Sequence, residues 1–379
     1  MKICYIASGA SIHTQRWLNY FTRKGHEVHL ITEGIREGYF ERVQLHPLSF
    51  PIPRFWPGSG YINAFVWIIQ TRRLVNRIKP DIIDAQYIST RGYLAATSGF
   101  HPIVLTAIGS DILIDSEESR LYRFLTKLAL RKAEIVICDS ETLRKELVKL
   151  GTDPAKIRII CNGIDTTRFN PQPGKEFKDG LGLQGLPIII SIRNFKPVYN
   201  IEMLIRAIPL ILEHSSQAHF LIVGDGEQRE YLESLATSLG VSENISFLGW
   251  ILHDELPDYL ASADIYVSTS RSDSTSMSLQ EAMACELAPV VTDLSANREW
   301  VQDEENGFIV PQNDPQSLAK KVIYLIENEE IRERFGKGGR KIIKERAEYE
   351  KEMGKVEELY LGMIGAQKSS KIQGRERAR

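Results

Sequence analysis

The chain has 379 residues, of which 43% are apolar and 25% are charged, and its formal net charge is −2. This balance is typical of globular proteins and excludes a collagen-like repeat, a disulfide scaffold or disorder of the whole chain, while the length favours two domains. Residues 1–172 hold 23 Lys and Arg against 16 Asp and Glu, whereas the remainder hold 24 against 33. The two halves are therefore expected to meet different partners, and the small net charge gives no pull toward nucleic acid.

Cysteine usage and the N-terminal residues bear on the compartment. The four cysteines lie outside any C-x-x-C pair, mostly in or beside apolar runs: Cys4, Cys138, Cys161 and Cys285. Buried free thiols are the expectation, which suits a reducing compartment such as the cytoplasm. The apolar start of the chain is short and breaks into polar residues, so it is interpreted as a first strand rather than a signal peptide.

The first half alternates short β-rich runs with helical patterns, which predicts parallel βαβ units. Strands are predicted at 2–7, 27–32, 82–85, 103–106, 135–138 and 157–161. Helices are predicted at 14–24, 62–78, 121–132 and 140–150. A polar stretch rich in Pro and Gly follows, so the domain boundary is placed after residue 172.

The pattern then restarts in the second half. Strands are predicted at 188–192, 219–223, 245–248, 265–269 and 289–292. Helices are predicted at 201–213, 227–239, 256–261, 278–285, 315–328 and 331–336, and a long charged helix at 339–363 closes the chain. The expected organisation is an N-terminal Rossmann-like domain (1–172), a C-terminal one (173–345), a final helix (346–366) and a mobile basic tail (367–379). Two doubly wound sheets are expected to bind ligands at the carboxyl ends of their strands, in a cleft between the domains.

The segment 270–284 is the most informative. Its loop is rich in small hydroxyl residues and opens a helix near Ser278, so its backbone N–H groups could surround an anion. Asp273 and Glu281 lie eight residues apart, and carboxylates suit the paired hydroxyls of a sugar or ribose. The alternative is a helix capped by Ser278 with Glu281 completing a capping box, and the residues alone favour that alternative.

Motifs along most of the chain give a family resemblance. Asp273, seven spacers and Glu281 are followed by Ala-Met-Ala and, further on, Pro289-Val-Val. Further matching motifs begin at Gly25, Gly109, Asn162, Gly224, Phe247, Ala263, Asn297 and Asn306. In this order and spacing the chain resembles the retaining glycosyltransferases of family 4, also called glycosyl transferases group 1. Their fold is GT-B, in which two Rossmann-like domains face a central cleft.

The resemblance implies roles for individual residues. Glu281 would hold the ribose of a nucleoside-diphosphate sugar, Asp273 the transferred sugar, and Arg193 the leaving diphosphate. The remaining donor-binding residues would be Gly9, Lys196, Gly224, Leu248, Trp250, Ser274, Thr275, Ser276, Met277 and Ser278.

The chain departs from the family pattern at three positions. Asp273 stands where Glu is usual, and Val198 stands where a Lys is common, so Lys196 would have to substitute for it. Ile108 replaces a frequent His before Gly109-Ser110-Asp111, and Asp111 is a candidate catalytic residue toward sugar or acceptor. His13 and Arg16 are candidates on the acceptor side, although a cap or surface role for His13 is the simpler interpretation.

The implied reaction moves a sugar to an acceptor hydroxyl with retention of configuration. Arg193 and backbone amides would stabilise the departing diphosphate. No metal site and no cofactor besides the donor substrate are expected, and the chain has no Asp-x-Asp triplet. Two alternatives stay open, namely a GT-B-shaped nucleotide-sugar epimerase and a non-catalytic nucleotide-sugar-binding partner of an active transferase. A dinucleotide oxidoreductase fits poorly because the first loop lacks G-x-G-x-x-G.

The acceptor is expected on the N-terminal half and could be a glycan, a polysaccharide precursor or a lipid-linked molecule. Trp56, Phe65 and Trp67, with Arg72-Arg73 and the excess positive charge, suggest peripheral contact with the inner face of a membrane. The alternative, which the pattern favours, is that Phe65, Trp67, Ile68 and Leu74 line the buried face of an ordinary helix.

Overall fold

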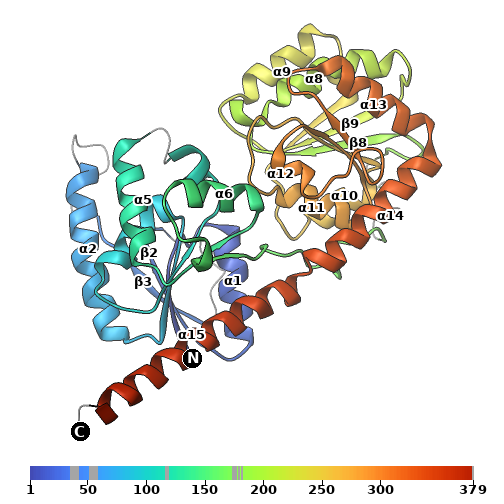
Figure 1. Ribbon diagram of the computed structural model, residues 1–379. Helices are drawn as coiled ribbons and strands as arrows, with labels where there is room; N and C mark the ends of the chain where they lie inside the picture. Colours follow the sequence, from blue (N-terminus) through green and yellow to red (C-terminus); the bar gives the residue numbers. More distant parts are fainter. Residues whose placement is uncertain are drawn as a thin grey trace. The chain divides into compact units, whose positions relative to one another are not determined.

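The computed structural model describes residues 1–34, 42–50, 59–115, 119–172, 177, 180 and 182–377 (Figure 1). The chain divides into two compact units, Gly163–Glu350 and a first unit that joins Met1–Asn162 to Lys351–Arg379. The second unit therefore begins at Gly163, ahead of the polar stretch where the sequence places the boundary. No helix in the described ranges is both long and apolar enough to cross a bilayer.

The first unit contains a seven-stranded parallel sheet with the order β3-β2-β1-β4-β5-β6-β7. Its strands are β1 (Lys2–Ile6), β2 (Glu27–Thr32), β3 (Val43–Pro47), β4 (Ile82–Gln86), β5 (Ile103–Thr106), β6 (Ile135–Cys138) and β7 (Ile157–Ile159). Its helices are α1 (Ile12–Arg23), α2 (Ser59–Ile78), α3 (Tyr93–Thr97), α5 (Arg120–Lys132), α6 (Glu141–Lys149) and α15 (Tyr349–Arg377), with short π-helical segments η1 (Ile88–Gly92) and η2 (Asp111–Asp115) and a 3₁₀ turn η3 (Pro154–Lys156). The sequence predicts all of these strands except the edge strand β3.

The two faces of this sheet have different covers. On one face Cys4 and Ile6 of β1 join a buried cluster that includes residues of α2, α3, α5 and α6. On the other face Phe21 of α1 stacks on Tyr360 of α15, with ring centroids 5.3 Å apart. The last helix of the chain is therefore part of the first unit's core, and it continues to Arg377 through residues that the sequence analysis assigns to a tail.

The second unit contains a six-stranded parallel sheet with the order β10-β9-β8-β11-β12-β13. Its strands are β8 (Ile188–Ile192), β9 (His219–Val223), β10 (Ile245–Gly249), β11 (Ile265–Ser268), β12 (Ala288–Thr292) and β13 (Phe308–Val310). Its helices are α8 (Ile201–Leu212), α9 (Arg229–Ser238), α10 (Leu256–Ser262), α11 (Met277–Ala284), α12 (Ser295–Arg298), α13 (Pro315–Glu327) and α14 (Glu329–Arg346), with 3₁₀ turns η4 (Pro197–Tyr199) and η5 (Ser242–Asn244). The sequence predicts neither α12 nor β13.

Helix α14 corrects the prediction for the end of the chain. The predicted helices 331–336 and 339–363 are in fact α14 and α15, separated at Ala347-Glu348. Helix α14 runs through Gly336, where a Cβ atom would lie 1.9 Å from the Glu286 carbonyl oxygen, so this glycine permits close packing rather than ending the helix. The break occurs because Ile164 donates its N–H to the Ala347 carbonyl (2.7 Å) and accepts the N–H of Tyr349 (3.1 Å). This strand-like pairing competes with the helical pattern.

Each sheet has a point at which the strand order reverses, between β1 and β4 in the first unit and between β8 and β11 in the second. In open α/β sheets, ligands bind beside the carboxyl ends of the strands at such a point. The residues that follow β8 and β11 are therefore the first place to search for a site.

Candidate active site

Arg193 directly follows β8 and lies in the predicted position at the switch point of the second unit. Its Nη2 forms an ion pair with Asp273 Oδ2 at 2.8 Å, and the two side chains are only 10% and 15% exposed. The guanidinium also donates to Ser268 Oγ and to Ser276 Oγ, and it lies 5.3 Å from the ring centroid of Tyr199. Burial by itself lowers the pKa of the Arg193 guanidinium, but the Asp273 carboxylate together with Tyr266 and Tyr199 outweighs this effect, so the pKa is raised.

The loop between β11 and α11 surrounds this arginine with hydroxyl groups. Ser276 is the N-cap of α11, because its Oγ accepts the N–H of Leu279 at 3.2 Å. The predicted cap at Ser278 is therefore wrong, since that hydroxyl instead lies 2.8 Å from the Tyr266 hydroxyl. The alternative of a capping box completed by Glu281 is wrong for the same reason.

Asp273 is fixed at the start of the same loop. Its Oδ1 accepts the N–H of Ser274 at 2.9 Å, while its Oδ2 faces Arg193. Two loops that follow neighbouring strands are thus held together by one buried ion pair. The sequence analysis names both partners but does not foresee that they bind each other.

Glu281 lies one and a half turns into α11, and its side chain is only 4% exposed. Its Oε1 lies 2.9 Å from His253 Nε2, in the loop that precedes α10. The His253 ring packs against Phe169 with centroids 5.4 Å apart, and Arg168 donates to the His253 carbonyl oxygen. Sequence reasoning missed His253, because a lone histidine in a loop carries no spacing signal.

Steric crowding explains why glycine stands directly after β9. Gly224 has a φ of +134°, and a Cβ atom there would lie 1.9 Å from the Arg193 carbonyl oxygen. Only glycine allows the backbone after β9 to approach the backbone after β8 this closely. Close packing of the Gly224 backbone against the Arg193 backbone therefore helps to fix the position of Arg193.

Three other predicted donor residues lie in or just after β8 and β10. Lys196 is exposed, Leu248 is half-buried, and Trp250 is 72% exposed just beyond β10. Arg271, which the sequence analysis does not single out, ties the turn around Val198 in place. Its guanidinium donates to the Pro197 carbonyl oxygen at 3.1 Å and to Asn200 Oδ1 at 3.0 Å.

The predicted residues of the first unit lie at the carboxyl edge of their own sheet. Gly9 donates its N–H to Thr32 Oγ1 at 3.0 Å, in the loop before α1. His13 and Arg16 occupy the first turns of α1 and are half-buried. Their predicted role in a cleft stays a prediction.

Asp111 is fully buried and has a structural task. Its carboxylate accepts the N–H groups of Ile88 (2.6 Å), Ile108 (3.1 Å) and Gly109 (3.0 Å), and so ties the loop after β4 to the loop after β5. Burial raises the pKa of Asp111 to about 6, although these three hydrogen bonds oppose the shift. A direct role toward sugar or acceptor stays a prediction.

The structure of α2 distinguishes in part between the two interpretations of the predicted aromatic cluster, membrane contact and an ordinary buried helix face. Ile68 and Leu74 pack against the core, as the ordinary-helix alternative predicts, and Trp67 donates its indole N–H to the Ser49 carbonyl oxygen at 3.0 Å. Phe65 is 63% exposed, so that alternative is wrong for this residue. Trp56 lies outside the described residues.

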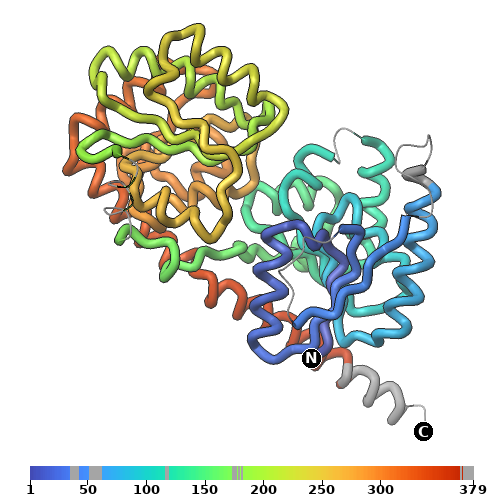
Figure 2. The backbone as a smooth tube through the Cα atoms, turned by 180° about the vertical axis from the view of Figure 1, so that it is seen from behind, coloured from blue at the N-terminus to red at the C-terminus, as the bar shows by residue number. Residues whose placement is uncertain are grey.

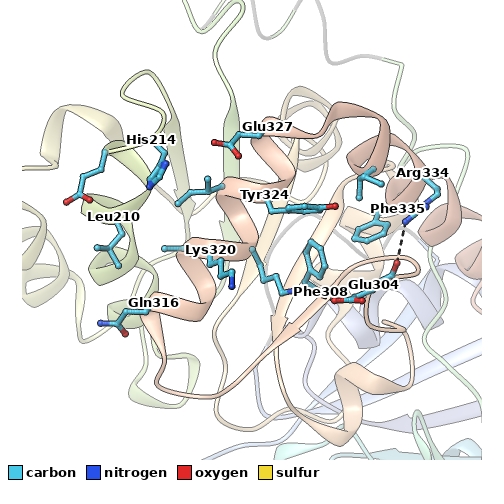
Figure 3. Close-up of a pocket in the computed structure, with 15 residues that line it drawn as sticks. Leu210, His214, Glu304, Phe308, Gln316, Lys320, Tyr324, Glu327, Arg334 and Phe335 are labelled. Atoms are coloured by element: carbon cyan, nitrogen blue, oxygen red, sulfur yellow. Dashed lines mark hydrogen bonds and ion pairs between the residues drawn. The ribbon is translucent and has the colours of Figure 1, made fainter.

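A hollow of about 840 Å³ lies elsewhere on the second unit, around α13 (Figure 3). Phe308 lines it and is in edge-to-face contact with Tyr324 and Phe335 at centroid distances of 5.7 and 5.2 Å. Both acidic and basic side chains line it, and none of the predicted site residues does. It therefore does not compete with the switch point as the candidate active site.

A doubly wound sheet whose switch point holds a buried guanidinium, two carboxylates and a capped helix N-terminus is suited to a sugar nucleotide, and proteins with two such sheets include the GT-B glycosyltransferases. The family model for glycosyl transferases group 1 matches residues 175–342, and that for glycosyl transferase 4-like domains matches residues 2–140. The chain belongs to glycosyl transferases group 1, and the resemblance predicted from the sequence is confirmed.

Relatives and solved structures agree with this assignment. The chain is 27% identical over 383 residues to an uncharacterized glycosyltransferase of Methanocaldococcus jannaschii, covering 95% of this chain and 96% of the relative. It is 25% identical over 364 residues to the N-acetyl-alpha-D-glucosaminyl L-malate synthase of Bacillus anthracis, covering 92% of each. Among solved structures, sucrose-phosphate synthase from Thermosynechococcus elongatus has a TM-score of 0.83 at 19% identity, covering 97% of this chain and 100% of the other. HepE of Anabaena, solved with UDP, has a TM-score of 0.80 at 20% identity, covering 96% and 100%. The GT-B fold is thereby confirmed.

Proposed function

We propose that this chain transfers a sugar from a nucleoside-diphosphate sugar to an acceptor hydroxyl with retention of configuration and without a metal ion. The observation that carries the proposal is the buried cluster of Arg193, Asp273 and Ser276 at the switch point of the second sheet. Family membership supports the transfer of sugar from a nucleotide sugar. The acceptor, whether glycan, polysaccharide precursor or lipid-linked, belongs to the proposal alone.

Arg193 is equipped to bind the diphosphate. An arginine has five N–H donors, and those on Nε and Nη2 are directed at Ser268, Ser276 and Asp273. Within the part of the chain that the structure describes, Nη1 makes no hydrogen bond, so its two donors are available for phosphate oxygens. Negative charge develops on the leaving diphosphate in the transition state, where a fixed cation and the N-terminus of α11 stabilise it most.

Glu281 and His253 suit the ribose. Because His253 occupies Oε1 of the carboxylate, Oε2 is left to accept a ribose hydroxyl. His253 is thus a positioning residue for Glu281. Trp250, exposed beside β10, offers a ring face for the base.

Relatives use different nucleotide sugars, so the donor of this chain must be identified by experiment. HepE of Anabaena was solved with UDP-glucose, whereas another relative, from Mycolicibacterium smegmatis, is a GDP-mannose-dependent mannosyltransferase at 26% identity. Four buried free thiols support a reducing, cytoplasmic location for the reaction, with or without peripheral attachment to the inner face of a membrane.

The test is turnover with a panel of UDP-, GDP- and ADP-sugars, with the anomeric configuration of product read by NMR. We expect one nucleotide to be selected, the product to keep the donor's configuration, and Glu281→Ala and Asp273→Ala to lower turnover. If a donor binds but neither variant changes turnover, the catalytic proposal fails and a non-catalytic binding partner is favoured. If the donor sugar is epimerised without transfer, the epimerase alternative is favoured.

A further inference from the structure

We propose that α2 and α5 of the first unit together form a face that docks on an anionic lipid bilayer. This inference does not rest on the proposed reaction, because lipid binding is measured without donor or acceptor. The face is larger than the cluster that the sequence indicates, since α5 was not part of that prediction.

The apolar part of the face is exposed on both helices. On α2, Ile62, Phe65 and Ile69 are 49%, 63% and 38% exposed, and their spacing of three and four residues places them on one stripe. On α5, Leu121, Tyr122 and Phe124 are 45%, 39% and 63% exposed. Six large apolar side chains gathered on neighbouring surface helices are more than the scattered exposure of an ordinary surface.

The six residues gather in one region. Both helices contact α3, and they lie side by side in both views of the chain (Figures 1 and 2). The helices run antiparallel to the strands of a parallel sheet, so their N-terminal turns are at its carboxyl edge, where α/β units bind ligands. Apolar side chains on this face therefore lie beside the edge at which an acceptor is expected.

The charge of the face selects the kind of surface it fits. The two helices contain no Asp or Glu, and together they carry eight cations: Arg72, Arg73, Arg77, Arg120, Arg123, Lys127, Arg131 and Lys132. Among the described residues, no carboxylate forms an ion pair with any of them. Along α2 the apolar stripe continues into Arg72 and Arg73, and at the start of α5 Arg120 and Arg123 alternate with the exposed apolar residues.

An anionic bilayer satisfies both features at once. Phenylalanine rings enter the interface between headgroups and acyl chains, while arginine side chains bind lipid phosphates. A second copy of the chain would bring the arginines of this face against those of its partner, which repels, and a purely anionic polymer would leave the six apolar side chains unburied. The lipid surface is the partner that buries the rings and pairs the cations.

Vesicle sedimentation tests the proposal on the full chain. We expect binding to vesicles of phosphatidylcholine mixed in equal amounts with phosphatidylglycerol, weak binding to phosphatidylcholine alone, and weaker binding as salt is raised. Phe65→Ser combined with Phe124→Ser, and separately Arg120→Glu combined with Arg123→Glu, should each reduce binding to acidic vesicles roughly tenfold or more.

Matched controls lie away from this face. Tyr231→Ser with Leu361→Ser removes apolar side chains that are 45% and 50% exposed on α9 and α15. Lys320→Glu with Lys341→Glu changes the net charge by the same amount as the arginine pair. Both controls should bind acidic vesicles like the parent chain.

Three results would overturn the proposal. Equal binding to neutral and acidic vesicles, or to neither, would remove the role of charge or of lipid. Binding that survives the phenylalanine pair would show that the apolar stripe does not enter the bilayer. A change of the chain from dimer to monomer on phenylalanine replacement, seen by analytical ultracentrifugation, would assign the face to a second copy instead.

Discussion

Removal of the Asp273 carboxylate should expose how the candidate site balances its charges. In the Asp273→Ala variant, Arg193 stays buried but loses the oxygen that lies 2.8 Å from its Nη2. Breaking a buried ion pair from one side costs about 3–5 kcal/mol. Because Arg193 keeps its bonds to Ser268 and Ser276, we expect the lower limit, about 3 kcal/mol. For a domain of 150–250 residues this lowers Tm by about 6–12 °C.

The assay is thermal unfolding with and without UDP. If a diphosphate binds Arg193 as proposed, Asp273 and the diphosphate share one guanidinium in the parent chain, whereas in the variant the diphosphate replaces the missing anion. We therefore expect UDP to raise the Tm of Asp273→Ala by more than it raises the Tm of the parent, by mass action on the folded state. Loss of catalytic turnover would accompany this gain in nucleotide binding.

The control is Asp293→Ala, which breaks the ion pair with Arg298 at 2.7 Å between side chains that are 47% and 55% exposed. Solvent screens such a pair, so Tm should change little and the UDP shift should match that of the parent. If Asp273→Ala unfolds at the same temperature as this control, or if its UDP shift is no larger, the claim that Asp273 neutralises Arg193 is refuted.

Three further changes probe the site and the core. Gly224→Ala should destabilise the fold by about 3 kcal/mol or more, because its Cβ atom would lie 1.9 Å from the Arg193 carbonyl oxygen; chemical denaturation measures it. His253→Ala should lower kcat/KM for the nucleotide sugar about tenfold, mainly through KM, because Glu281 loses a hydrogen bond to its charged group. Burial raises the pKa of Asp84 to about 7, so the folded state keeps a proton that the unfolded state releases above about pH 4. The free energy of unfolding should then fall as pH rises from about 4 to 7, and Asp84→Asn should flatten that slope in urea titrations.

Each of these predictions has a contrary result. Gly240→Ala serves as the control for Gly224, because it shares a positive φ of +71° but no atom lies near its Cβ position. Equal losses in the two variants would remove the steric argument. His214→Ala controls for the general loss of an imidazole, and an effect of His253→Ala on kcat alone would contradict a positioning role. An Asp84→Asn variant with the parent's pH slope would show that this carboxyl does not titrate on unfolding.

Much of the fold could be predicted from sequence, because buried parallel strands are continuous β-branched runs such as β8. The missed strands β3 and β13 are short edge strands with only three to five residues each, and in β3 polar residues interrupt the pattern. The border between α14 and α15 was mispredicted, because the pairing of Ile164 with residues 347–349 is a tertiary contact. The local sequence pattern cannot reveal such a tertiary contact.

The candidate site likewise has features that the sequence predicts and features that it does not. Arg193 and Asp273 follow predicted strands, so sequence and topology together place them at one switch point. The cap at Ser276 depends on backbone angles that the run of serines does not specify, which explains the choice of the wrong serine. His253 contacts Glu281 from a distant loop, and the burial of Asp111 depends on two loops meeting. These features arise only when the chain is folded.

The stacking of Phe21 on Tyr360 has a consequence for how the chain matures. The second unit is inserted between the segments of the first, since the first unit needs both Met1–Asn162 and Lys351–Arg379. During synthesis the inserted unit can fold while the N-terminal sheet still lacks one of its covers. The face on which Phe21 and Tyr360 stack stays incompletely covered until Tyr349–Arg377 is synthesised, and Tyr360 then donates its hydroxyl to Asp84.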